Sequence, residues 1–98
     1  MGCYFMVTIY IDNPENRAPY DEYIRMVRPI VEKHGGKYLV RTEKLDCLTE
    51  SWRPNRLIIV RFDSREALDQ CFASEEYRSI KALRENTVDS RILIAEGE

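Results

Sequence analysis

Two periodicities divide the chain into predicted strands and helices. Residues 3–11 are rich in alternating β-branched and aromatic side chains, and residues 57–62 are almost continuously apolar, so both segments predict strands. Shorter apolar segments predict two further strands, at 37–42 and 91–95. Residues 45–48 predict a short extension or an edge strand.

The first predicted helix follows the first strand. Apolar side chains from Tyr20 to His34 recur at helical spacing and form one face. Pro29 lies inside this pattern and is expected to kink or loosen the helix, because it removes one backbone hydrogen bond. Gly35 and Gly36 end the helix, because glycine adopts the left-handed cap conformation without strain.

A second helical region begins at Asp63 or Ser64, both of which are favoured cap residues. The pattern breaks before Ser74, which is expected to cap a further helical piece. The element order is therefore β-α-β-β-α-β. This order is typical of an α+β fold, the ferredoxin-like sandwich, in which helices cover one face of an antiparallel sheet. The length of 98 residues supports one such domain over residues 1–98.

Both faces of the predicted sheet carry apolar side chains. The face that alternates with the helix-facing positions holds tyrosine, methionine, leucine and isoleucine where a solvated face would hold charges. Its members are Tyr4, Met6, Thr8, Tyr10, Leu57, Ile59 and Arg61. Such a face needs a cover, and a second copy of the sheet is the simplest one. We expect a homodimer through this open sheet face, with a cavity where Thr8, Tyr10 and Arg61 point inward.

Charge and composition narrow the classes of function. The chain holds 15 basic and 17 acidic side chains, a net charge of -2 and no basic block, so we expect no nucleic-acid partner. It contains no run of about 18 apolar residues, so we expect no membrane span. The three cysteines form no CxxC pair, which indicates reduced thiols and a cytoplasmic protein. With one histidine and no glycine-rich nucleotide motif, we expect neither a metal site nor a cofactor.

Charged side chains in apolar surroundings are the first candidates for chemistry. An arginine in a strand, such as Arg61 or Arg41, either pairs with a carboxylate or binds an anionic substrate and stabilises developing negative charge. The pattern leaves the sheet face of Arg41 open. His34 ends a helix, where the dipole favours a protonated imidazole, so capping is preferred over catalysis. Lys81 and Arg84 fall late in a helix and are interpreted as surface residues.

Aromatic and hydroxyl side chains complete the set of candidate ligand-binding residues. Trp52 lies in a predicted loop, and it either covers the end of the core or closes over a cavity against an aromatic ligand. Tyr10 and Tyr77 either donate hydrogen bonds to a ligand or pack with satisfied hydroxyls. Thr8 is the remaining candidate. The single histidine and the lack of a nucleophile elbow provide no argument for nucleophilic catalysis.

Three motifs occur in order along the chain. They are His-Gly-Gly-Lys-Tyr-Leu-Val-Arg over residues 34–41, Arg-Leu-Ile-Ile-Val-Arg-Phe-Asp-Ser over 56–64 and Glu-Tyr-Arg-Ser-Ile-Lys-Ala-Leu-Arg over 76–84. With them, nearly the whole chain resembles the family called domain of unknown function 1330. The resemblance implies the dimeric α+β barrel superfamily, its βαββαβ fold and its paired sheets. It implies no particular activity.

Two functions from different classes follow as hypotheses. The first is a small homodimer that binds an apolar or aromatic molecule in the cavity, with cofactor-free isomerase or monooxygenase activity by analogy with other members of the superfamily. The second is a structural or interaction module without catalytic activity. RNA-binding domains share the element order but need exposed aromatics and a basic face, so RNA binding is disfavoured. The residues alone do not decide whether the protein is an enzyme.

Overall fold

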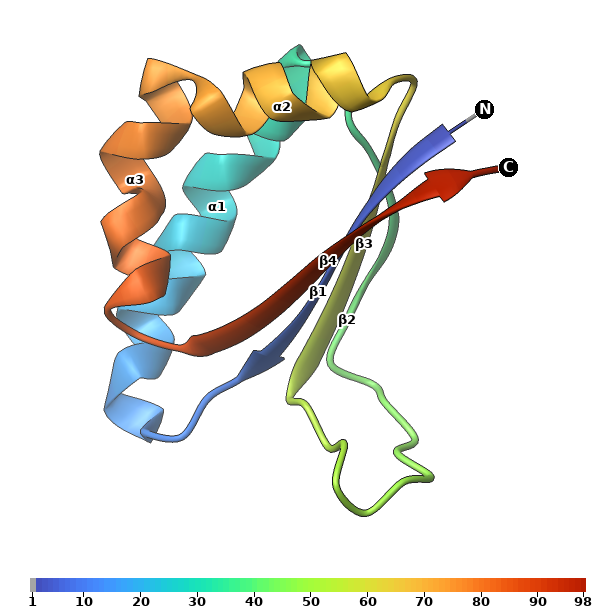
Figure 1. Ribbon diagram of the computed structural model, residues 1–98. Coiled ribbons are helices and arrows are strands. Elements are labelled where there is room, and N and C mark those ends of the chain that lie inside the picture. The colour runs from blue at the N-terminus through green and yellow to red at the C-terminus, as the bar shows by residue number, and fades with distance from the viewer. Residues whose placement is uncertain (1) are drawn as a thin grey trace.

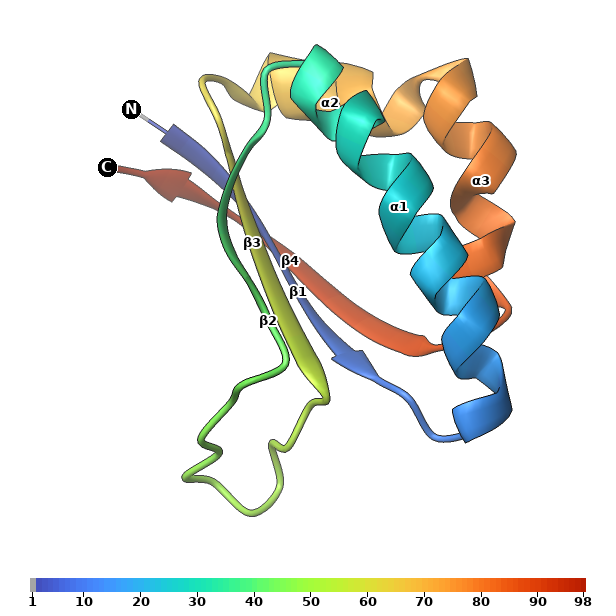
Figure 2. The same cartoon turned by 180° about the vertical axis from the view of Figure 1, so that it is seen from behind.

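An antiparallel sheet of four strands carries three α-helices on one face in the computed structural model, which describes residues 2–98 (Figure 1). The strands, in the spatial order β2-β3-β1-β4, are β1 (Gly2–Tyr10), β2 (Lys37–Thr42), β3 (Arg56–Phe62) and β4 (Asp89–Gly97). The helices are α1 (Arg17–Lys33), α2 (Arg65–Ala73) and α3 (Glu75–Glu85), and a 3-10 turn, η1, spans Pro14–Asn16. Seen from behind, the helices lie on the same side of the sheet (Figure 2). The predicted ferredoxin-like α+β fold is confirmed.

Serine caps set the start of the second and third helices. The Ser64 hydroxyl accepts a hydrogen bond from the Ala67 N–H at 3.1 Å, and the Ser74 hydroxyl accepts one from the Tyr77 N–H at 3.2 Å. Each bond satisfies a backbone donor that the first helical turn leaves free. Ser74 has extended backbone angles, φ -67° and ψ 151°, so it separates α2 from α3. The predicted division of this helical region is therefore confirmed.

The end of α1 depends on two glycines with different roles. The helix runs through Pro29 to Lys33 without a break. Gly35 then adopts φ 85°, the left-handed conformation predicted for the cap. Gly36 is buried instead, and a Cβ atom there would lie 2.5 Å from Val31 Cγ1. Its lack of a side chain therefore permits close packing of the chain against α1.

Two strand predictions differ from the structure. Residues 45–48 form no strand, because they belong to a long loop, 43–55, whose Leu48 side chain is 90% exposed. The last strand is longer than the predicted 91–95, since β4 pairs with β1 along its whole length, from Gly2 opposite Gly97 to Tyr10 opposite Asp89. Backbone pairing extends the strand into polar residues that the apolar pattern does not include.

The core lies between the helices and the predicted inner face of the sheet. Its buried side chains are Cys3, Val7, Ile9, Tyr20, Tyr23, Ile24, Val27, Val31, Ile58, Val60, Phe62, Leu68, Cys71, Tyr77 and Ile80. Phe72 joins helix and sheet, since its ring centroid lies 4.4 Å from that of Phe5 and 4.9 Å from that of Tyr77. Cys71 is fully buried and packs as a small apolar side chain.

The substitution Gly36→Ala tests this packing. The new methyl would lie 2.5 Å from Val31 Cγ1 and 2.9 Å from Phe62 Cζ, so we expect the free energy of unfolding to fall by about 1–3 kcal/mol. Urea unfolding followed by circular dichroism measures the change. Gly97→Ala is the matched control, because no heavy atom lies within 4 Å of its added methyl. Equal unfolding midpoints for the two variants would contradict the close approach.

Candidate functional site

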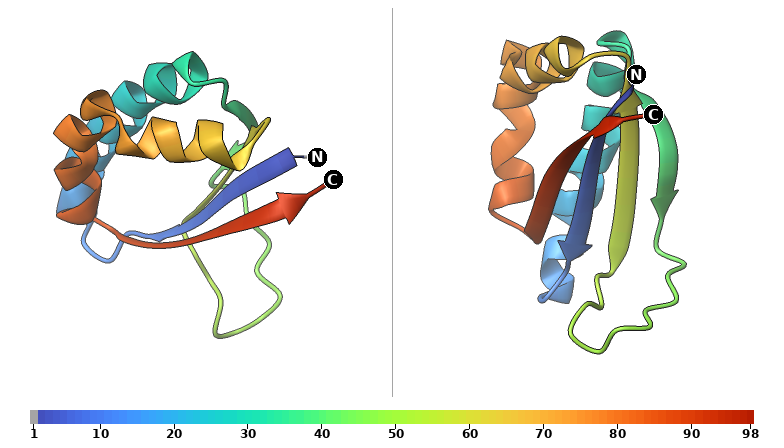
Figure 3. Two further views of the ribbon diagram at one scale, coloured as in Figure 1. Left: turned by 45° about the horizontal axis from the view of Figure 1, so that its top comes forward. Right: turned by 45° about the vertical axis from the view of Figure 1, so that its right-hand side comes forward.

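The open sheet face is apolar across three strands. Met6 of β1 lies at its centre, between Ile59 of β3 and Leu93 of β4 in the strand register. Leu93 is 54% exposed, and Met6 and Ile59 are only partly buried. No helix covers this face within residues 2–98 (Figure 3). A surface of this kind is usually an interaction or ligand-binding surface.

The loop 43–55 connects the end of β2 to the start of β3 and extends beyond the sheet (Figure 3). Its side chains and those of the open face line two adjoining hollows. The first has a volume of about 380 Å³ and is lined by Met6, Thr8, Leu45, Asp46, Cys47, Leu48, Thr49, Trp52, Pro54 and Leu57. The second has about 310 Å³ and is lined by Met6, Thr8, Tyr10, Ser51, Trp52, Arg91, Ile92 and Leu93. We call the two together the sheet-face hollow. They share Met6, Thr8 and Trp52.

Three of the predicted site residues meet in the sheet-face hollow: Thr8, Tyr10 and Trp52. Trp52 is 51% exposed, so its ring is available to a ligand. Arg91 is a fourth member that the sequence analysis missed. It lies opposite Thr8 in the register, and its guanidinium carbon stands 5.0 Å from the centroid of the Tyr10 ring. The hollow therefore combines aromatic faces, hydroxyl donors and one cation.

Arg61 lies elsewhere on the open face. It is opposite Tyr4, whereas Thr8 is opposite Leu57, four residues further along β3. A spacing of four residues along a strand corresponds to about 13 Å. Arg61 also pairs with Asp63 at 3.0 Å, and its hydrogen bonds with Tyr4 and Asp63 raise its pKa. The structure therefore does not place Arg61 in one cavity with Thr8.

The other predicted site residues lie on the helix side of the sheet. Arg41 is opposite Ile58, an inner-face residue, and its guanidinium carbon stands 5.7 Å from the centroid of the Tyr38 ring. The Nδ1 atom of His34 is 2.9 Å from the carbonyl oxygen of Ile30, which fits the helix-capping interpretation. Tyr77 is buried. The sequence pattern did not assign Arg41 to either sheet face, and the register places it on the inner face.

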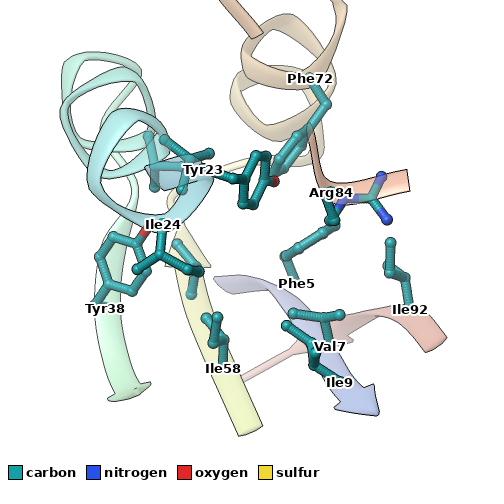
Figure 4. A pocket seen from close by; sticks show the side chains of 13 residues that line it. Phe5, Val7, Ile9, Tyr23, Ile24, Tyr38, Ile58, Phe72, Arg84 and Ile92 are labelled. Atoms are coloured by element: carbon teal, nitrogen blue, oxygen red, sulfur yellow. The ribbon is translucent and has the colours of Figure 1, made fainter. Parts of the chain in front are cut away.

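A small pocket lies between the helices and the sheet (Figure 4). It has a volume of about 30 Å³ and an apolar lining from both layers, including Phe5, Val7, Ile24 and Ile58. Arg84 of α3 is its one charged lining residue. The position of Arg84 late in a helix predicts a surface residue, but the side chain is partly buried. The helix turns it toward β4, where its Nη1 donates a hydrogen bond to the Ser90 hydroxyl.

Arg84 lies beside a pair of buried tyrosines. The hydroxyl oxygens of Tyr23 and Tyr77 are 3.1 Å apart. Burial raises the pKa of Tyr23 well above its usual value, so the phenolate is disfavoured and the hydroxyl stays protonated. Burial alone would lower the pKa of Arg84, but the Tyr77 and Tyr23 hydroxyls outweigh it, and the pKa of Arg84 is raised overall. The guanidinium therefore keeps its charge.

Across residues 2–98, no group of three or more His, Cys, Asp or Glu side chains could hold a metal ion together. No helix in that part of the chain is long and apolar enough to cross a membrane.

The sequence matches the family described as domain of unknown function (DUF1330) over residues 3–98. No curated protein matches the chain.

Solved structures of similar fold come from bacteria. A dimeric ferredoxin-like protein of unknown function from Jannaschia sp. CCS1 superposes with a TM-score of 0.83 at 12% identity, covering 99% of this chain and 100% of that one. A protein of unknown function from Rhodopseudomonas palustris gives 0.81 at 19%, with coverages of 99% and 82%. SnoaB, a cofactor-independent oxygenase from Streptomyces nogalater, gives 0.72 at 8%, with 99% and 93%. These likenesses establish the fold.

Thiol reactivity tests the geometry of the first hollow. Cys47 is partly exposed there, whereas Cys3 and Cys71 are buried. Burial raises the pKa of Cys71 to about 11 and also raises that of Cys3, so little thiolate forms at either near pH 8. We expect Ellman's reagent to modify one thiol quickly in the folded protein and all three in urea. Cys47→Ser removes the fast phase. A fast phase that survives Cys47→Ser and disappears in Cys71→Ser would contradict this arrangement.

Proposed function

The chain belongs to the DUF1330 family, and we propose that it acts as a homodimer, joined through the open sheet face, that binds an apolar or aromatic small molecule in the sheet-face hollow. The observation that carries the proposal is the convergence of Trp52, Tyr10 and Arg91 on a hollow of that face whose other lining residues are partly apolar and partly polar.

The exposed apolar area supports the dimer. Met6, Ile59 and Leu93 lie side by side in the register, so a second sheet placed on them removes a continuous apolar surface from water. The likeness in fold to a dimeric ferredoxin-like protein adds support by analogy. A partner sheet would also close the sheet-face hollow from its open side.

The lining of the hollow supports a small, flat ligand. Each part of the hollow falls in the range of about 300–1,000 Å³ usual for ligand pockets. The Trp52 and Tyr10 rings offer faces for stacking, and Thr8 offers a hydroxyl. Arg91 would bind a carboxylate, phenolate or enolate oxygen of the ligand.

Beyond ligand binding, we also propose a type of reaction. We favour a cofactor-free isomerase or monooxygenase, in which Arg91 would stabilise an enolate or phenolate as it forms and Tyr10 would donate a hydrogen bond to it. The likeness in fold to a cofactor-independent oxygenase is the analogy behind this preference. The three free cysteines suit the reducing cytoplasm as its location. Oxygen uptake with substrate and no added cofactor distinguishes the monooxygenase from the isomerase.

A second candidate is an interaction module without catalytic activity. Leu48 is 90% exposed and Trp52 is 51% exposed on the same loop, and both would be available to another protein. In that case side chains, and no metabolite, would fill the sheet-face hollow.

The dimer is tested by a pair of methionine substitutions. We expect sedimentation equilibrium to give the mass of two chains for the wild-type protein and of one chain for Met6→Lys, because a buried unpaired charge at the centre of the interface is costly. Met26→Lys is the control, since Met26 is exposed on α1, away from this face. A wild-type monomer at micromolar concentration, or a dimer that Met6→Lys leaves intact, would contradict the proposal.

The ligand site is tested by thermal shift with a set of aromatic and carboxylate compounds. A ligand at a hundred times its Kd adds about 2.7 kcal/mol of stability, which raises the Tm of a domain this small by roughly 10–20 °C. We expect Trp52→Ala to weaken such a ligand about tenfold and Glu50→Ala, an exposed neighbour outside the lining, to leave it unchanged. No stabilising compound from a broad set would favour the interaction module instead.

A further inference from the structure

The inner face of β4 is only partly covered by the helices. Ile92 and Ile94 are opposite Val7 and Phe5 in the register, so they belong to the helix-facing side of the sheet. They are nevertheless 43% and 36% exposed, whereas Val7 is buried. In Figure 1 the helices α2 and α3 form a corner, and β4 runs below it at the outer edge of the sheet. We call Ile92 and Ile94 the β4 shelf.

Arg84 lies next to the β4 shelf without a counterion. Within residues 2–98 no carboxylate pairs with its guanidinium, in contrast to the carboxylate partners of Arg17, Arg61 and Arg65. Its Nε is buried and has no hydrogen-bond partner. Buried polar groups are nearly always satisfied, and a partly buried cation usually has an anion beside it. Among the described residues, the guanidinium therefore has polar neighbours but no carboxylate counterion, and its Nε has no hydrogen-bond partner.

The apolar pocket continues from Arg84 into the protein. Figure 4 shows Arg84 and Ile92 on one side of the pocket, with Tyr38 and Ile24 on the opposite side. The enclosed volume of about 30 Å³ holds roughly one water molecule, so most of a ligand would have to lie on the exposed shelf. Tyr23 also lines the pocket, and its mutual bond with Tyr77 uses only one of the two hydroxyl protons.

We propose that Arg84 binds the carboxylate of a small amphipathic molecule whose apolar part lies on the β4 shelf and reaches toward the pocket. This second site is built around the inner face of β4, opposite to the face that carries Arg91 and Leu93. The two sites adjoin at Ile92, which lines both the small pocket and the sheet-face hollow, whereas Arg84 lines the small pocket alone. The proposal does not depend on the proposed function.

The chemistry of the site favours a carboxylate over a phosphate. One guanidinium carries one positive charge and forms two parallel hydrogen bonds to a carboxylate, which matches a monoanion in charge and geometry. A phosphate dianion in a partly buried site needs further cations, and the pocket lining contains none besides Arg84. Ile92, Ile94 and Phe5 suit an aliphatic or aromatic body in place of a sugar or a polar chain.

Isothermal titration calorimetry on the full chain tests the site with octanoate, 4-phenylbutyrate and 2-naphthoate, each compared with its uncharged primary amide. We expect at least one acid to bind saturably and its amide to bind roughly 10- to 100-fold more weakly, since hydrogen bonds to charged groups contribute that much. Arg84→Met retains most of the side-chain volume and is expected to cause the same loss. Arg78→Met, an exposed arginine on the same helix, is the matched control and is expected to bind normally.

A second variant covers the case in which Arg84→Met fails to fold. Ile94→Glu places a negative charge on an exposed position of the β4 shelf, outside the lining of the sheet-face hollow, and is expected to weaken the acid about tenfold or more. Circular dichroism confirms the fold of each variant. The inference is overturned if no acid binds, if the amides bind equally well, or if folded Arg84→Met binds like the wild type. Loss of binding in Trp52→Ala but not in Arg84→Met would also overturn it, while the proposed function would stand.

Discussion

The position of β1 between β3 and β4 is the constraint on which the rest of the structure depends. Its neighbours pair with it along almost its whole length, so its side chains form the centre of both sheet faces. On one face Val7 and Ile9 are buried under the helices, and on the other Met6 remains only partly covered. A chain of 98 residues has enough helix to cover one face of such a sheet. An apolar second face of this kind is usually an interaction or ligand-binding surface.

The edge strand β4 also leaves apolar side chains uncovered on the helix side of the sheet. Because α2 and α3 meet at a corner instead of lying along β4, Ile92 and Ile94 are exposed on the inner face while Leu93 is exposed on the outer one. An edge strand with apolar side chains on both faces carries a risk of aggregation unless something covers it. Coverage by a second sheet would protect Leu93 only. The side chains of Ile92 and Ile94 on the inner face would need a different occupant.

Periodicity predicted the strands and helices because burial imposes it directly on the sequence, as the alternation of Ile58, Val60 and Phe62 illustrates. The register between two paired strands leaves no such pattern in the sequence. Arg91 and Arg84 were missed as site residues because their positions depend on the register of β4 against β1 and on the corner between two helices. The face of Arg41 was unreadable for a related reason: the register of β2 shifts between Tyr38 and Val40, and such a shift reverses simple alternation.

Two arginines with opposite surroundings suggest how the sites differ in electrostatics. Arg91 is exposed, pairs with Asp89 at 3.4 Å and stacks on Tyr10, so its field is screened by solvent and shared with a carboxylate. Arg84 is partly buried, keeps its charge beside the hydroxyls of Tyr23 and Tyr77 and has no carboxylate partner within residues 2–98. In a less polar environment the same anion interacts more strongly with the cation and less with salt. An anion held by Arg84 should therefore resist added salt. An anion held by Arg91 in the open monomer should be displaced by added salt. Only closure of the sheet face by a second chain would make the two anions respond alike to salt.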